Sequence, residues 1–157
     1  MIMKNFKYFF IFLFILSCGY SPIYQVENKI DLKLDEINFS GNKKISREIV
    51  KGLESFKKNN SNNVFNINFN VSQQESIVTK DKKGNPTSYK LVLEVETNLI
   101  NKSNNKNYEK KFSKVTTYNS KKNQFELDQY KINLEKNMIS QILQDMNIFL
   151  SIIGNDI

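Results

Sequence analysis

Apolar and polar side chains alternate most regularly between residues 65 and 72. An alternation with a period of two is typical of a strand with one buried face and one polar face. The intervening polar residues are asparagine and serine, and Ile77 and Val78 allow the same strand to continue further. The apolar positions of the regular part are Phe65, Ile67, Phe69 and Val71.

A second alternation lies between residues 89 and 99, with polar side chains such as Lys90 and Glu94 on its other face. The segment 81–86 between the two alternations contains a Gly-Asn-Pro sequence, which is typical of a turn. The two strands are therefore predicted to form a hairpin. The apolar positions of the second strand are Tyr89, Leu91, Leu93, Val95 and Leu99.

Two further segments have less regular strand patterns. In residues 32–39 the apolar side chains form two alternating pairs that are offset by one residue, which predicts a strand with a bulge. In residues 108–118, Phe112 and Val115 cannot share a face unless the strand contains a bulge. The latter segment is rich in lysine, which is typical of a sheet edge, where charge blocks unwanted pairing. These lysines are Lys110, Lys111 and Lys114.

Helical spacing of apolar residues occurs twice. Residues 43–57 carry an apolar stripe, although Gly52 within it costs about 1 kcal/mol relative to alanine unless another backbone approaches closely. From Leu127 to Ile153 the spacing is helical again, with no glycine or proline before Gly154. A helix of roughly 28 residues would be about 42 Å long. Its apolar stripe is expected to pack against the sheet rather than on a membrane surface.

The predicted order is strand, helix, strand, strand, strand, helix. A sheet with one apolar face and two amphipathic helices has one simple solution, in which both helices cover that face. We therefore predict an α+β two-layer sandwich with a mixed or antiparallel sheet of about four strands, formed by residues 32–157 as one domain. The other face of the sheet stays polar and meets either water or a polar partner.

Composition excludes several chemistries. The 157 residues carry a net charge of +7, contain no histidine, and have Arg47 as the only arginine. Without histidine the commonest general base and most transition-metal sites are lost, and one arginine is too few for sequence-specific nucleic-acid recognition. The lysine excess fits either AT-rich codon usage or attraction to an anionic partner such as phosphate-bearing lipid.

An enzyme would therefore depend on carboxylates and lysines. The adjacent Asp35 and Glu36, and the pair Glu94 and Glu96 two residues apart, are the candidate pairs for acid–base catalysis. Exposed strand carboxylates next to Lys90 are more often solvated surface groups. We predict no catalytic activity, no metal site and no cofactor.

The first 17 residues are predicted to be a signal peptide. Lys4 and Lys7 precede an apolar run that is too short to span a membrane, and Ser17 precedes Cys18, the only cysteine. The tetrapeptide ending at Cys18 resembles a bacterial lipobox, although Leu16 departs from the usual smaller or β-branched residue. The alternatives are an uncleaved signal anchor or a cysteine that is there by chance.

In the lipoprotein interpretation, Cys18 carries a thioether-linked diacylglycerol and an N-acyl chain, and residues 18–31 form the lipidated tether. Three acyl chains anchor firmly, because each buried methylene contributes about 0.8 kcal/mol. Gly19 follows the cysteine, in place of the aspartate that retains enterobacterial lipoproteins in the inner membrane. By that resemblance, the outer membrane is the expected location.

Residues 18–24, Cys-Gly-Tyr-Ser-Pro-Ile-Tyr, resemble the start of the mature lipopolysaccharide-assembly lipoprotein LptE of alphaproteobacteria. The strand and short helix, the meander turned at Gly84-Asn85, and Tyr118-Asn119 before a long closing helix extend the similarity. The resemblance implies a non-catalytic protein on the periplasmic side of the outer membrane. It would plug the LptD β-barrel, help it assemble, and assist lipopolysaccharide delivery to the outer leaflet.

Three lysines near the predicted hairpin turn are candidates for contact with lipid A phosphates. The alternative is that hairpin lysines are simply solvated. The candidate residues are Lys80, Lys82 and Lys83.

Residues 37–46 are also similar to the opening of a POTRA domain, a periplasmic module of barrel-assembly proteins. POTRA domains place two helices between their first two strands, whereas only one helix fits between Phe39 and Phe65 here. A POTRA-like or other periplasmic binding lipoprotein acting in outer-membrane protein assembly is therefore the second hypothesis. A generic adhesin or peptidoglycan-binding lipoprotein is a third.

Overall fold

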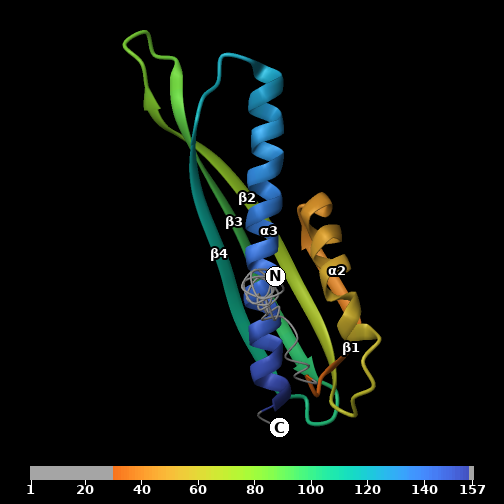
Figure 1. The fold of residues 1–157 in the computed structure, drawn as a ribbon. Helices are drawn as coiled ribbons and strands as arrows, with labels where there is room; N and C mark the ends of the chain where they lie inside the picture. The colour runs from red at the N-terminus through yellow and green to blue at the C-terminus, as the bar shows by residue number, and fades with distance from the viewer. Residues whose placement is uncertain (1–29, 156–157) are drawn as a thin grey trace, which may run out of the picture.

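The structure is a computed structural model that describes residues 30–155. The predicted signal peptide, Cys18 and most of the tether lie outside these residues. The order of elements is β-α-β-β-β-α, as the sequence predicts (Figure 1). The elements are β1 (Lys33–Gly41), α2 (Lys43–Lys57), β2 (Val64–Lys80), β3 (Pro86–Asn101), β4 (Asn107–Asn119) and α3 (Gln124–Asn155).

The four strands form one mixed sheet in the order β1-β2-β3-β4. β1 pairs with β2 in parallel, while β2 with β3 and β3 with β4 are antiparallel. Both helices lie in front of the same face of the sheet (Figure 1). The predicted α+β two-layer sandwich is therefore confirmed. Within residues 30–155, α2 alone joins β1 to β2, which differs from the two helices of a POTRA domain.

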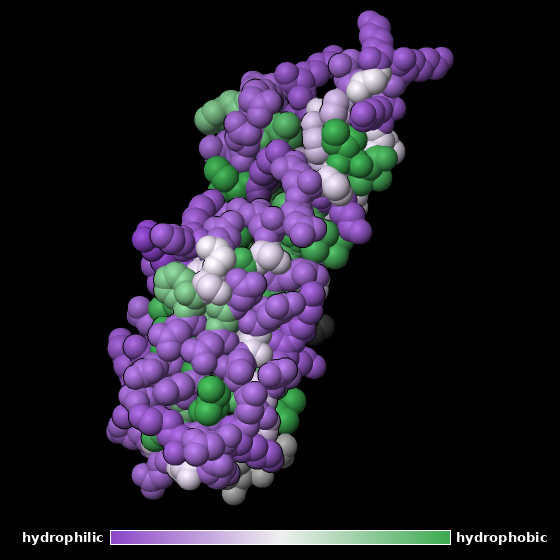
Figure 2. Space-filling view, turned by 180° about the vertical axis from the view of Figure 1, so that it is seen from behind, coloured by the Kyte–Doolittle hydropathy of each residue, from purple (hydrophilic) through white to green (hydrophobic). Residues whose placement is uncertain are grey.

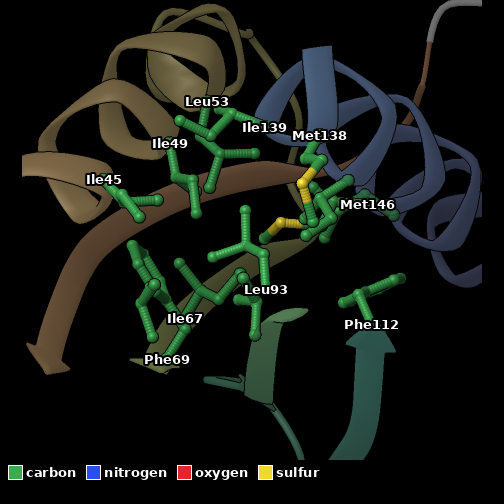
Figure 3. Packing of buried hydrophobic residues seen from close by; sticks show 14 of the residues in the cluster. Ile45, Ile49, Leu53, Ile67, Phe69, Leu93, Phe112, Met138, Ile139 and Met146 are labelled. Atoms are coloured by element: carbon green, nitrogen blue, oxygen red, sulfur yellow. The ribbon is translucent and has the colours of Figure 1, made fainter. Parts of the chain in front are cut away.

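The core lies between the helices and the sheet (Figure 3). Phe65 and Ile67 of β2 and Leu93 of β3 are almost completely buried there, as are Ile142 and Met146 of α3. The apolar stripe of the long helix thus packs against the sheet, as expected. At about 25 cal/mol per Å² of apolar area removed from water, this layer supplies the main stabilisation of the fold.

The predicted bulge in β1 is present. Leu34 pairs with Phe65 and Ile37 pairs with Ile67, so three residues advance along β1 for two along β2. The extra residue lets both apolar pairs of β1 face the helices, because a strand without it would turn one pair outward.

β4 contains no bulge, and its mixed pattern has a different explanation. Phe112 is 5% exposed and faces the core, whereas Val115 is 58% exposed on the opposite face. β4 is an edge strand, as its lysines predict. Two of those lysines also form ion pairs, Lys114 with Asp145 of α3 at 2.7 Å and Lys111 with two glutamates of β3.

α2 starts at a tight turn between β1 and the helix. Asn42 is the N-cap, and its side-chain oxygen accepts hydrogen bonds from the main-chain nitrogens of Lys44 and Ile45. Capping of this kind satisfies amides that have no partner within the helix. Gly41 before it has φ +84°, and a β-carbon there would overlap the main-chain oxygen of Val71. Only glycine fits this position without strain.

Gly52 is explained by helix packing, but its close neighbour is not the backbone that the sequence predicts. A β-carbon on Gly52 would lie 2.6 Å from both terminal carbons of the Leu143 side chain on α3. The neighbour is therefore a side chain. α3 also passes through Gly154, one residue beyond the predicted extent, and that glycine lies against Leu32 and Asp31.

Candidate functional site: the open face and the hairpin tip

The face of the sheet away from the helices, here called the open face, is predominantly hydrophilic (Figure 2). Side chains reach the open face by alternation along the strands, since every second residue of β2, β3 and β4 points away from the core. The central part of the open face is formed by Glu36, Asn38, Ser40, Asn66, Asn68, Asn70, Ser72, Glu94, Glu96, Asn98, Glu109, Lys111 and Ser113.

Amide side chains are aligned across neighbouring strands of the open face. Asn38, Asn68 and Asn98 occupy paired positions on β1, β2 and β3. The Asn38 Nδ2 donates to Asn68 Oδ1 at 3.1 Å, and one row further the Ser40 Oγ donates to Asn70 Oδ1 at 3.0 Å. These polar groups are therefore paired with each other, which keeps the face organised without an apolar contact.

A shallow depression of about 660 Å³ crosses all four strands of the open face. No helix residue lines it. Its walls are two rows of side chains, and its floor is the main chain between them, at Phe39, Phe69, Thr97 and Lys110. The walls are Asn38, Asn68, Asn98 and Glu109 on one side and Ser40, Asn70, Glu96 and Lys111 on the other.

One solvent-inaccessible side-chain atom in this depression has no partner among the described residues. Asn98 Oδ1 is inaccessible to solvent and accepts no hydrogen bond from the described residues. A buried acceptor without a donor costs roughly 1–3 kcal/mol, so such atoms are uncommon in native folds.

The candidate catalytic carboxylates are held by lysines. Lys111 Nζ lies 2.9 Å from Glu94 and 3.3 Å from Glu96, and these contacts, with Glu94 first, raise the pKa of Lys111. Asp35 pairs with Lys102 at 2.7 Å, and the hydrogen bond from Lys102 lowers the pKa of Asp35. A carboxyl that acts as a general acid needs a raised pKa, whereas the pKa of Asp35 is lowered.

Asp35 and Glu36 both lie at the bulge of β1, and their side chains have different partners. Glu36 accepts a hydrogen bond from Asn66 at 3.5 Å, while Asp35 turns to Lys102. Among residues 30–155, no group of three or more histidine, cysteine, aspartate or glutamate side chains is arranged to hold a metal ion.

The β2–β3 hairpin projects beyond the rest of the sheet (Figure 1). Asp81 organises its turn by accepting hydrogen bonds from the main-chain nitrogens of Lys83 and Asn85, both at 2.8 Å, and from the Asn85 side chain at 3.0 Å. These bonds, with the Asn85 side chain first, lower the pKa of Asp81. Gly84 has φ +87°, so the sequence pattern located the turn correctly.

The structure places all three candidate lysines at this tip. Lys80 ends β2, and Lys82 and Lys83 lie in the turn, where all three are exposed. Ile77 and Val78, just below the tip, are 48% and 51% exposed. The tip thus combines cationic ends with an accessible apolar stem, which the sequence did not reveal because these two residues resemble ordinary strand positions.

A cluster at the base of the projecting hairpin was not predicted. Lys131 of α3 contacts Glu75 at 2.8 Å and lies about 5.5 Å from the rings of Tyr89 and Tyr118, and the Tyr118 hydroxyl donates to Glu75. Tyr89 and Tyr118 stack at 5.2 Å. The cluster joins α3 to β2, β3 and β4.

The charges in this cluster support each other. Burial raises the pKa of Glu75, but the hydrogen bonds from Lys131 and Tyr118 outweigh it, and the net shift is downward. Burial opposes the charge of Lys131, yet its bonds with Glu75 and Tyr118 raise its pKa above the usual range. Burial and the bond to Glu75 raise the pKa of Tyr118. The contacts lie far apart in sequence, so no local pattern signals them.

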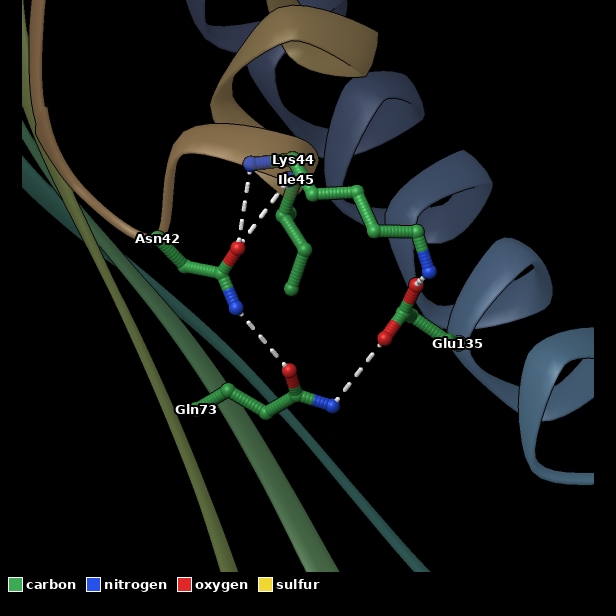
Figure 4. Close-up of polar contacts among 5 residues, drawn as sticks. All are labelled: Asn42, Lys44, Ile45, Gln73 and Glu135. Atoms are coloured by element: carbon green, nitrogen blue, oxygen red, sulfur yellow. Dashed lines mark hydrogen bonds and ion pairs between the residues drawn. The ribbon is translucent and has the colours of Figure 1, made fainter. Parts of the chain in front are cut away.

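A second polar network joins the start of α2 to α3 (Figure 4). Asn42 donates to Gln73 at 3.1 Å, Gln73 donates to Glu135 at 3.3 Å, and Lys44 pairs with Glu135 at 2.6 Å. A groove of about 580 Å³ between the two helices lies next to it, with Ile132 and Leu143 among its lining residues. The network fixes the two helices over the sheet.

No helix among residues 30–155 has the length and apolar character needed to cross a bilayer. No family model matches the sequence, and no curated protein matches it.

Solved structures, by contrast, share the fold. Rare lipoprotein B from Shewanella oneidensis superposes with a TM-score of 0.53 at 16% identity, covering 73% of this chain and 96% of that one. A minor lipoprotein from Acinetobacter baumannii superposes with a TM-score of 0.53 at 11% identity, covering 74% of this chain and 90% of that one. A putative lipoprotein from Caulobacter crescentus superposes with a TM-score of 0.51 at 10% identity, covering 78% of this chain and 89% of that one. The chain thus has the fold of solved lipoproteins, and identities this low show the fold alone.

Proposed function

We propose that this chain is a non-catalytic outer-membrane lipoprotein that plugs an LptD-like β-barrel, helps it assemble, and assists lipopolysaccharide transport to the outer leaflet. The observation that carries the proposal is the division of the sandwich into a closed apolar layer and an open polar face. The interior of a large outer-membrane barrel is polar, so a plug needs a core of its own and polar surfaces toward the wall.

Two further features support it. The segment up to Cys18 has the pattern of a lipoprotein signal, with the diacylglycerol and N-acyl chains on that cysteine as the anchor. The fold is also that of solved lipoproteins, one of which is a rare lipoprotein B. The POTRA alternative receives no support from the fold, because one helix joins β1 to β2 and α3 has no POTRA counterpart.

The test of this role is affinity capture of the full-length lipidated protein from outer membranes. We expect a large β-barrel protein to be recovered with it. The Cys18→Ala variant should be found in the soluble periplasmic fraction unless the barrel retains it. Recovery of the wild-type protein without any barrel partner would overturn the proposal.

Lipopolysaccharide contact is assigned to the hairpin tip. Lys80, Lys82 and Lys83 would bind lipid A phosphates by charge-assisted hydrogen bonds, and Ile77 and Val78 would meet the acyl chains. Both parts of such an amphiphile then have a matching surface within one hairpin.

Charge reversal tests the tip directly. Lys82→Glu combined with Lys83→Glu should weaken binding of purified lipopolysaccharide by at least tenfold, while Lys57→Glu combined with Lys58→Glu, at the exposed end of α2, should leave it unchanged. Unchanged binding in the tip variant would remove this assignment without affecting the proposed barrel partner.

A further inference from the structure

The depression itself is lined by two glutamates and two lysines, but the open face around it has an unbalanced charge. In the rows that form it and the row on either side, the charged side chains are Glu36, Glu94, Glu96, Glu109 and Lys111. Lys33 and Lys90 lie beyond these rows, toward the two ends of the sheet. The centre of the face is therefore acidic, although the whole chain carries a net charge of +7.

The hydrogen-bonding groups of the depression are of both kinds. Glu96 and Glu109 offer only acceptor oxygens, whereas the side-chain amides of Asn68, Asn70 and Asn98 each carry donor hydrogens. Charge rather than hydrogen bonding therefore decides the partner, and a ligand that balances the charge of this face is cationic.

The shape fits side chains from a flat wall. The two wall rows of this trench are two residues apart along each strand, so their main chains are roughly 7 Å apart, since a strand advances about 3.4 Å per residue. The trench crosses all four strands and opens to solvent along its length. Extended lysine or arginine side chains can lie in it, with their charged ends at the glutamates.

We infer that the depression between the Asn38–Glu109 row and the Ser40–Lys111 row docks a cationic strip of the barrel wall, formed by lysine or arginine side chains. This inference rests on the proposed function and deepens it by assigning the face that meets the barrel and the chemistry of the partner surface. Complementary charge of this kind orients one protein on another and selects against wrong registers.

Charge reversal in the full-length lipidated protein provides the test. Glu96→Lys combined with Glu109→Lys should lower the amount of co-captured barrel at least tenfold. Glu48→Lys combined with Glu54→Lys makes the same charge change on exposed residues of α2, and should not alter capture. Raising the ionic strength should weaken wild-type capture, because exposed charges are screened.

A milder variant keeps the test decisive if the reversal disturbs folding. Glu96→Gln combined with Glu109→Gln retains the shape of the side chains, and should give an intermediate loss with an unchanged thermal midpoint. Full capture of the barrel by both open-face variants would overturn the inference and leave the proposed function standing. Absence of any barrel with the wild type would overturn both.

A photo-crosslinking residue at Asn70 identifies the occupant. Crosslinks from Asn70 to the barrel polypeptide, with fewer from Gln144 on the outer side of α3, are the expected result. Crosslinks from Asn70 to lipopolysaccharide sugar alone would overturn the inference, because the occupant would then be a saccharide.

Discussion

Gly41 lies directly against the main-chain oxygen of Val71, which accepts a hydrogen bond at 3.0 Å from the next residue, Asn42. This contact holds the end of β1 on β2 while the chain turns into α2. Because β1 and β2 are parallel, α2 must carry the chain back along the sheet, and the turn at Gly41 starts that return.

We expect Gly41→Ala to lower the free energy of unfolding by roughly 2–5 kcal/mol. The positive φ costs an alanine about 1–2 kcal/mol, and crowding against the Val71 carbonyl adds about 1–3 kcal/mol. Gly84→Ala is the matched control, because Gly84 has a similar φ of +87° with no atom within 4 Å of the added carbon. Urea unfolding measures the loss of stability in each variant, and the difference between the two losses is the cost of crowding at Gly41. Equal losses would show that the Val71 carbonyl does not crowd the added carbon.

The two faces of β4 predict a second contrast. Phe112 packs edge-on against Phe149 of α3 with ring centres 5.8 Å apart, so Phe112→Ala should cost about 3–5 kcal/mol. Val115→Ala, on the open face, should change stability by no more than about 0.5 kcal/mol. Thermal denaturation of each variant is the measurement. A comparable loss of stability in both variants would contradict this contrast, because it would mean that Val115 also faces the core, as it would if β4 contained a bulge.

The Glu75–Lys131–Tyr118 cluster predicts an acid-sensitive stability. Since the folded pKa of Glu75 lies below its ordinary value of 4.5, its contribution is fully present above pH 4.5 and is lost as the pH falls through the folded pKa. Glu75→Gln should therefore reduce the urea midpoint at pH 7 more than at pH 3. Glu54→Gln on the exposed surface of α2 is the control. If Glu75→Gln shifted the urea midpoint equally at pH 7 and pH 3, the Glu75 carboxylate would not be the source of the stabilisation.

Asn98 predicts a conflict between stability and partner binding. Removing an unsatisfied buried acceptor from a strand interior should stabilise the isolated protein, so Asn98→Val is expected to raise the unfolding free energy by about 1 kcal/mol. The same substitution should weaken capture of the barrel, because it replaces an amide in the wall of the depression with an apolar side chain. Calorimetry of the purified variant and affinity capture measure the two effects, and a destabilised Asn98→Val would show that the acceptor is satisfied in solution.

Local patterns were sufficient for much of this protein. The alternation around Phe65 and Leu93 gave the strands, the helical spacing gave α2 and α3, and Gly84 with Asn85 marked the hairpin turn. One apolar face per element then left the two-layer sandwich as the simple arrangement. These predictions succeeded because burial of apolar surface follows the period of each secondary structure, which can be read along the chain.

Tertiary structure alone decided the features that join distant residues. Glu75 meets Lys131, and Gly52 meets Leu143, only because helices and strands pack at particular registers, and no short-range pattern encodes those registers. The trench on the open face has the same origin, since its walls combine residues of all four strands. The sequence by itself determined which side chains are polar and outward, and the pairing of the strands brought their acceptors together with an excess of negative charge.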